Sequence, residues 1–213
     1  HDARLKAFLA DPDVKGRIAE HGRTAQEVLR TYFEQAGFFR GQRVAVVDIG
    51  WNATIQHYLE QSFAADGAYP DVVGYYFAYM HNLHQRPLKH GSIEGLMQDR
   101  RRHNPQERAP SDFEELFEQG ARALHATTVG YQSQNGTIEP VLKSDDAPDR
   151  QAEIRCNPAI EAMQQGVLLH FEHFMAAQKL TGLSFDELKP YAMGLMERAV
   201  VYPTPDEVDA ITR

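Results

Sequence analysis

Residues 43–56 read Arg-Val-Ala-Val-Val-Asp-Ile-Gly-Trp-Asn-Ala-Thr-Ile-Gln, and this stretch decides the fold class of the chain. Its β-branched run, which leads into Asp48, predicts a strand buried on both faces, as in parallel sheets. Gly50 marks a turn, and residues 52–64 have the composition of a helix. The aromatic run at 72–79 predicts a second strand. Strand, turn, helix and strand form a βαβ unit, so the class is α/β.

The rest of the chain is mainly helical in its pattern. Asn135-Gly136 between two apolar runs predicts a β-hairpin over 127–142 with a type I′ turn. Residues 81–110 show no clear period and indicate a long loop, with a short strand near Ile93 as the one exception. Capping boxes at Ser111 and Ser184 predict two helix starts. Outside the βαβ unit, helices are expected at 3–10, 13–36, 111–124, 151–180, 185–200 and 205–212.

These elements predict a Rossmann-like βαβ core with a β-hairpin and a helical C-terminal portion. The polar stretch 144–150 divides the chain into an α/β part with N-terminal helices, residues 1–143, and a helical part, residues 144–213. We expect both parts to pack on one core, as a single continuous domain. Apolar residues at helical spacing predict two buried stripes, one of Phe113, Leu116 and Phe117 and the other of Leu168, Phe171 and Met175.

Composition excludes several classes of protein. The chain has 213 residues with 22 Lys and Arg against 30 Asp and Glu, a net charge of −8, which argues against nucleic acid or an anionic membrane as the main partner. Cys156 is the only cysteine, so neither an intrachain disulfide nor a multi-thiolate zinc site can form. No apolar run is long enough to span a membrane. A start at His1 without a signal peptide predicts a cytoplasmic fragment of a longer protein.

The turn at 48–56 is the candidate site. Asp48 stands at the carboxyl end of the predicted strand, where open α/β sheets bind their ligands, and can hold a magnesium ion or a ligand hydroxyl. The amides after Gly50 lie at a helix N-terminus, the usual seat of a phosphate. In this scheme Asn52, Thr54 and Gln56 orient the ligand and Trp51 stacks on a base or sugar. The structural alternative is that Asp48 caps the local turn and Trp51 packs on a neighbouring helix.

The same residues resemble a region of large bacterial proteins of the haloacid-dehalogenase (HAD) superfamily, hydrolases associated with capsule and surface-polysaccharide biosynthesis. The family pattern is Asp-Ile-Gly-Trp-x-Gly-Ser/Thr-x-Gln after an apolar strand. The resemblance extends over roughly residues 25–210, but only the motif at residues 48–56 is specific to the family. The matching positions are Asp48, Ile49, Gly50, Trp51, Thr54 and Gln56.

This chain departs from the family in two ways. Ala53 stands where the family has glycine, so a positive φ at that position would strain the backbone. HAD phosphatases also use Asp-x-Asp-x-Thr/Val directly after a strand, with the first Asp as nucleophile. Here the only Asp-x-Asp is Asp11-Pro12-Asp13, which no strand precedes, so the hydrolase nucleophile is absent from this chain.

Other groups of residues allow competing chemistry. Histidines gather at His81, His84, His90 and His103, where Glu94 or Asp99 would complete a metal site, but an exposed loop explains them as well. His170, Glu172 and His173 share one helix, although a di-metal bundle needs two such motifs. The basic run Arg100-Arg101-Arg102 either meets a sugar phosphate or is simply solvated. Cys156 is expected to be a buried or incidental thiol.

Two functions follow. In the first, the chain is a module of a HAD-like protein from surface-polysaccharide biosynthesis that binds a sugar phosphate or nucleotide at residues 48–56, with any hydrolase activity belonging to the parent protein. In the second, it is a non-catalytic scaffold whose aromatic strand and long helices pack on the parent hydrolase or on a glycosyltransferase.

Overall fold

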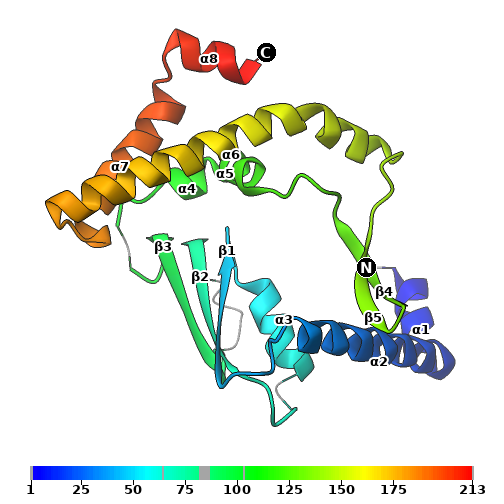
Figure 1. The fold of residues 1–213 in the computed structure, drawn as a ribbon. Helices are drawn as coiled ribbons and strands as arrows, with labels where there is room; N and C mark the ends of the chain where they lie inside the picture. The colour runs from blue at the N-terminus through cyan, green and yellow to red at the C-terminus, as the bar shows by residue number, and fades with distance from the viewer. Residues whose placement is uncertain (1, 64, 82–86, 103, 213) are drawn as a thin grey trace.

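A computed structural model describes residues 2–63, 65–81, 87–102 and 104–212, without the side chains of 210–212 (Figure 1). The part that leads into and forms the sheet contains α1 (Ala3–Ala10), α2 (Pro12–Gln35), β1 (Arg43–Asp48), α3 (Thr54–Phe63), β2 (Asp71–Tyr79) and β3 (Gly91–Asp99). The elements that follow are α4 (Ala109–Asp112), α5 (Glu114–Ala121), β4 (Thr128–Gln134), β5 (Thr137–Leu142), α6 (Pro148–Thr181), α7 (Phe185–Val201) and α8 (Pro205–Thr212).

The sheet confirms the α/β class and the βαβ unit. Its strand order is β1-β2-β3, and both neighbouring pairs are parallel. The register pairs Asp48 at the end of β1 with Tyr76 on β2. On the α3 side of the sheet, β2 buries alternate residues, of which Val72 and Tyr76 are almost fully enclosed.

The short strand expected near Ile93 is confirmed but is longer than expected: β3 has nine residues, so the expected loop over 81–110 is wrong over Gly91–Asp99. The composition of β3 gives only a weak strand signal, because glycine and acidic residues have low strand propensity. Its first glycine is needed for close packing: a Cβ on Gly91 would lie 2.8 Å from the Val72 nitrogen and nearer still to the Val72 carbonyl. Close contact with β2 therefore selects glycine where local propensity would select a β-branched residue.

The expectation that β1 is buried on both faces is also wrong. β1 lies at one edge of the sheet and alternates between half-buried and exposed residues. Val47 is 80% exposed, and its register partner Tyr75 is half-buried on the same face of β2. Only the α3 side of this edge is covered in the described part of the chain, so the apolar run of β1 has one face open to solvent.

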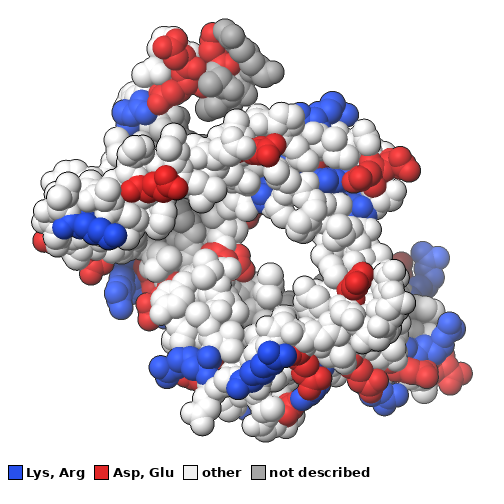
Figure 2. Space-filling view, viewed as in Figure 1, with Lys and Arg blue, Asp and Glu red and all other residues white. Residues whose placement is uncertain are grey.

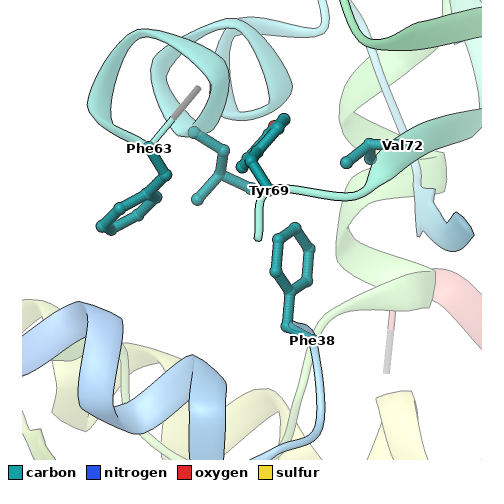
Figure 3. Packing of buried hydrophobic residues seen from close by; sticks show 5 residues of the cluster. Phe38, Phe63, Tyr69 and Val72 are labelled. Atoms are coloured by element: carbon teal, nitrogen blue, oxygen red, sulfur yellow. The ribbon is translucent and has the colours of Figure 1, made fainter. Parts of the chain in front are cut away.

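The core beside the sheet is aromatic. Phe38, Phe63, Tyr69 and Val72 pack together between α3, β2 and the end of α2 (Figure 3). Leu29 and Phe33 on α2 pack against this group. The first half of α2 does not join the core, as its exposed Ile18 shows. This packing fixes α3 on the sheet and with it the turn that precedes α3.

Turn and cap signals are only partly confirmed. Asn135 and Gly136 have φ values of 52° and 81°, as a type I′ hairpin requires. Ser184 and Glu187 form the predicted capping box of α7. The box predicted at Ser111 is wrong, because α4 includes Ser111 and α5 begins at Glu114 without a side-chain cap.

The predicted core stripe on α6 is wrong. Leu168 is 66% exposed and Phe171 is 55% exposed. Figure 1 shows the reason: α6 runs as a long arm over the carboxyl ends of the strands, and the helices near it leave much of its length without a covering layer. Helical spacing identifies an apolar face but carries no information about what covers that face.

Candidate functional site

Asp48 lies at the carboxyl end of β1, as predicted, and is half-buried. One of its carboxylate oxygens accepts a hydrogen bond from the backbone N–H of Gly50 at 3.2 Å. The turn-capping contact of the structural alternative is therefore present. One carboxylate has several acceptor positions, so this single bond leaves Asp48 able to accept from a ligand as well.

The turn after Asp48 is joined to the end of β2 by backbone hydrogen bonds. Ala78 N–H donates to the Ile49 carbonyl at 3.2 Å, and Met80 N–H donates to the Trp51 carbonyl at 2.7 Å. A Cβ on Gly50 would lie 2.8 Å from the Ala78 carbonyl oxygen, which explains the glycine. The turn is thus held in place by neighbouring backbone before any ligand arrives.

Ala53 has a positive φ, with a value of 53°. The residue is 1% exposed and packs among Tyr76, Tyr79 and Ile93. Left-handed backbone costs an L-residue about 1–2 kcal/mol. Here the methyl group is completely buried among aromatic rings, which offsets part of that cost at about 0.8 kcal/mol per buried carbon.

Backbone donors collect where α3 begins. Among the described residues no acceptor is recorded for the N–H groups of residues 52–56, whereas His57 N–H already donates to the Ala53 carbonyl. Asn52 and Thr54 are exposed beside these donors. Unpaired N–H groups at a helix start attract anions, because their partial charges add to the helix dipole. The geometry is suited to an anionic group such as phosphate.

Trp51 is half-buried and its indole N–H donates to a carboxylate oxygen of Glu118 on α5. The residue therefore contacts a neighbouring helix, in line with the structural alternative. Sequence reasoning missed Glu118, since nothing in the pattern of α5 marks it as a partner for an indole 67 residues away. A ligand that stacks on Trp51 would have to share the ring with this contact.

Gln56 is the predicted site residue that lies farthest from solvent, at 1% exposure. Its amide nitrogen donates to the Val72 carbonyl at 2.9 Å and to the Ser92 carbonyl at 3.2 Å, while Tyr76 donates to its amide oxygen at 3.1 Å. These bonds tie α3 to β2 and β3. We call this set the Gln56 lock; in it, Gln56 positions the turn by anchoring its helix and does not reach the open side.

Tyr76 is a neighbour of Asp48 that sequence reasoning did not include. Burial raises the pKa of the Tyr76 hydroxyl, and the negative charge of Asp48 adds to that increase. The hydroxyl is therefore neutral and serves as a donor to Gln56. The only signal that could have found it is register, since Asp48 and Tyr76 are paired across β1 and β2.

Of the basic run, Arg101 is already bound. Its guanidinium forms bonds with both oxygens of buried Asp99, donates to the Ile93 carbonyl at 2.7 Å and lies over the Tyr79 ring. Burial would raise the pKa of Asp99, but the bonds from Arg101 outweigh it and keep the pKa below its usual range. Arg100 and Arg102 are exposed, so this run is partly structural and partly solvated.

The metal alternatives gain no support from the described residues. Among them no group of three or more His, Cys, Asp or Glu is arranged to hold a metal ion. His81 and His90 lie against Tyr79 and Tyr69, and His84 and His103 fall outside the described residues. His170 lies against Phe174 on α6. Cys156 is exposed, so of the two expectations, a buried or an incidental thiol, the buried one is wrong.

Two comparisons with known proteins add no relative: no family model matches the chain, and no curated protein sequence matches it. None of the described helices combines the length and the apolar composition that crossing a membrane requires.

Proposed function

We propose that this chain is a ligand-binding module that holds a phosphate-bearing molecule, a sugar phosphate or a nucleotide, at residues 48–56. One observation carries the proposal: the N–H groups of residues 52–56, at the start of α3, have no acceptor among the described residues, and they follow Asp48 at the carboxyl end of a parallel strand. The amides take the phosphate, Thr54 adds a hydroxyl, and Asp48 takes a ligand hydroxyl or a magnesium ion.

The resemblance of residues 48–56 to HAD-like proteins of surface-polysaccharide biosynthesis gives the wider context of the proposal. In that context the sheet is one half of a Rossmann-like core, the chain is cytoplasmic, and any hydrolase activity belongs to other parts of a parent protein. The absence of the Asp-x-Asp-x-Thr/Val motif supports binding rather than nucleophilic catalysis by this chain.

Thermal-shift and calorimetric titrations test the binding proposal. The 213-residue chain is titrated with sugar phosphates, nucleotides and nucleotide sugars, with and without magnesium. At a hundredfold excess over the dissociation constant, a bound ligand adds about 2.7 kcal/mol of stability, which moves the melting temperature by several degrees. We expect one class of ligand to do so.

Variants locate the binding. With Asp48→Ala or Thr54→Val, the ligand concentration needed for the same shift in melting temperature should rise at least about tenfold. Asp13→Ala, at the exposed first turn of α2, is the matched control at a helix start that lacks the strand and turn. No shift with any ligand, or equal loss in the Asp13 control, would reject residues 48–56 as the site.

A scaffold function is the second candidate, and one observation favours it. The chain exposes 15432 Å² of surface, whereas a compact monomer of 24.1 kDa exposes about 10,000 Å². A module of this kind would pack on a parent hydrolase or a glycosyltransferase. Its test is co-purification with such a partner, against a control chain in which exposed apolar residues are replaced.

A further inference from the structure

A large hollow lies between the end of the sheet and the helices that follow it. It has a volume of about 1200 Å³, and its wall combines residues of the sheet end, α5, α6, α7 and α8. Phe77 on β2 and Phe117 on α5 both line it, and their ring centres lie 5.0 Å apart. Of residues 48–56 only Ile49 belongs to the wall. We call this space the α5–α6 hollow, and it is separate from the donors at the start of α3.

The wall is held together where α5 meets α6. A Cβ on Gly120 would lie 2.6 Å from the Met163 methyl carbon, so the glycine permits the close approach of the two helices. The side-chain nitrogen of Gln164 donates to the Gly120 carbonyl at 3.0 Å and to the Arg122 carbonyl at 2.8 Å. The hollow is therefore bounded by elements that are bonded to one another, and not by one bare helix face.

The wall is apolar apart from three side chains. Of the described residues that line it, only Arg122, Gln164 and Glu207 are polar. Gln164 is engaged with α5 as above. The carboxylate of Glu207 is neutralised by Arg198, which donates to it at 3.0 Å, and also accepts from the Thr204 N–H at 2.7 Å. Neither residue therefore calls for a charged partner in the hollow.

Arg122 is the exception, because its charge is not balanced in this way. The side chain is half-buried, and no ion pair of its guanidinium occurs among the described residues. Its acceptors are all uncharged: the Gln119 side-chain oxygen at 3.1 Å and the carbonyls of Ala123 at 3.3 Å and Glu153 at 3.1 Å. Three of five N–H groups are thus used, which leaves one on each terminal nitrogen. That number matches the two oxygens of a carboxylate.

The surface of the chain gives no other general attraction for anions. Figure 2 shows Lys and Arg interspersed with Asp and Glu on the face drawn, without a continuous basic patch among the described residues there. At a net charge of −8 the chain as a whole repels anions. A single guanidinium balances a carboxylate, whereas a phosphate monoester carries about −1.5 to −2 charges at pH 7. Arg122 in an apolar wall therefore favours a singly charged carboxylate.

We propose that the α5–α6 hollow binds a long-chain carboxylate, with the hydrocarbon chain against the apolar wall and the head group on Arg122. The volume exceeds the roughly 300–1,000 Å³ of pockets for compact ligands, and a flexible chain adapts to such a space. A hydrocarbon chain needs no hydrogen-bond partner. A bound peptide brings a backbone N–H and C=O with every residue, and this wall has few groups to pair with them.

Calorimetric titration of the full chain with dodecanoate, below its micelle-forming concentration, tests the proposal. Decanoate should bind about tenfold more weakly, because two fewer CH₂ groups leave water. Dodecylammonium has the same chain length but the opposite charge and should bind at least about tenfold more weakly than dodecanoate. No binding of dodecanoate would overturn the proposal. Equal or tighter binding of dodecylammonium would overturn the role of Arg122.

Variants of arginine locate the head group. Arg122→Gln should weaken dodecanoate binding at least about tenfold, and Arg122→Lys, which keeps the charge, should restore most of it. Arg155→Gln is the matched control, since Arg155 is exposed on α6 outside the wall and its replacement changes the net charge equally. Equal weakening by Arg122→Gln and Arg155→Gln would contradict a head-group site at Arg122.

A pair of leucine variants locates the hydrocarbon chain and covers the case in which Arg122→Gln fails to fold. Leu168 lines the hollow, whereas its neighbour Leu169 does not, and both are exposed. Leu168→Gln should weaken dodecanoate binding at least about fivefold and Leu169→Gln less than about twofold, with helix content checked by circular dichroism. Equal effects would reject the α5–α6 hollow as the site. Dodecanoate has no phosphate, and sugar phosphates and nucleotides have no long hydrocarbon chain, so this proposal and the one for residues 48–56 fail separately.

Discussion

The part of the molecule around the parallel sheet and the part built from α4 to α8 achieve order in different ways. Around the sheet, buried aromatic residues form a core, and in the Gln56 lock both the nitrogen and the oxygen of the glutamine amide group have hydrogen-bond partners. In the helical part, α6 has 34 residues but buries only Arg150 among its described residues. The difference teaches that chain length and helix content do not measure how much of a chain is packed.

The consequence is that the two parts should respond differently to the same kind of substitution. Around the sheet, a Cβ added at Gly50, Gly74 or Gly91 would overlap a neighbouring atom, which must then be displaced. Along α6, open space surrounds the helix, and the intrinsic helix propensity of a residue should decide the outcome.

Gly74→Ala should produce the largest effect. A Cβ at position 74 would lie 2.6 Å from Tyr76 Cε2 and closer still to the Gln56 amide oxygen. Neither side chain can move without breaking the Gln56 lock, so we expect a loss of about 3 kcal/mol or more in the free energy of unfolding, measured by urea denaturation. A loss below about 1 kcal/mol in the free energy of unfolding would show that the packing around Gly74 adjusts to an added atom as readily as the surroundings of α6 do.

Tyr76→Phe should cost less, about 1–3 kcal/mol, because it leaves the buried amide oxygen of Gln56 without its donor. The difference from the unmodified chain should depend on pH. Burial raises the pKa of Tyr76 above its unfolded value of about 10, so its contribution is fully present below pH 10 and is lost as the pH rises toward the folded value.

The measurement is urea denaturation of both proteins between pH 7 and pH 11. Burial also raises the pKa of Tyr69 to about 12, and Tyr69 is unchanged in the variant, so it provides a common background of alkaline destabilisation. The gap between the two proteins should narrow above pH 10. A constant gap would show that the Tyr76 hydroxyl titrates alike in the folded and unfolded chain.

The sequence predicted most of what depends on local signals. The strand that ends at Asp48, the helix after it, the hairpin at Asn135-Gly136 and the Ser184 capping box all have short-range causes in side-chain periodicity and turn chemistry. The position of Asp48 at a strand end followed from the same signals. β3 was predicted only as a short strand near Ile93, because Gly91 is chosen by the close approach of β2, a contact between residues distant in sequence.

The parts of the site that sequence could not give also depend on long-range contacts. The motif includes Gln56 as a presumed ligand residue, but only the register of β2 and β3 reveals that its amide bonds to Val72 and Ser92. Trp51 meets Glu118 through the packing of α5. The exposure of Leu168 is likewise invisible in a helical pattern that looks the same whether or not another surface covers it.

Gly166→Ala tests the helical side of the comparison. No atom lies within 4 Å of a Cβ built on Gly166, and the residue is in the interior of α6. Alanine should therefore stabilise the helix by about 0.5–1 kcal/mol, opposite in sign to Gly74→Ala. Thermal unfolding followed by circular dichroism measures the change. A destabilisation would mean that something packs tightly against this side of α6 in solution.

Glu207→Gln should have the smallest effect, confined to α8. Glu207 accepts bonds from Arg198 on α7 and from the Thr204 N–H, and these lower its pKa to about 2. A carboxyl whose folded pKa is lowered contributes stability above its unfolded pKa of about 4.3, and that contribution is lost as the pH falls toward 2. We expect faster amide exchange in α8 of the variant at pH 7, with the global melting temperature unchanged. Asp206→Asn, on the same turn but outside this ion pair, is the control. If the contact between α7 and α8 stabilises more of the helical part than α8 alone, amide exchange in α7 will also accelerate and the melting temperature will fall. The helical part would then unfold more cooperatively than its sparse burial suggests.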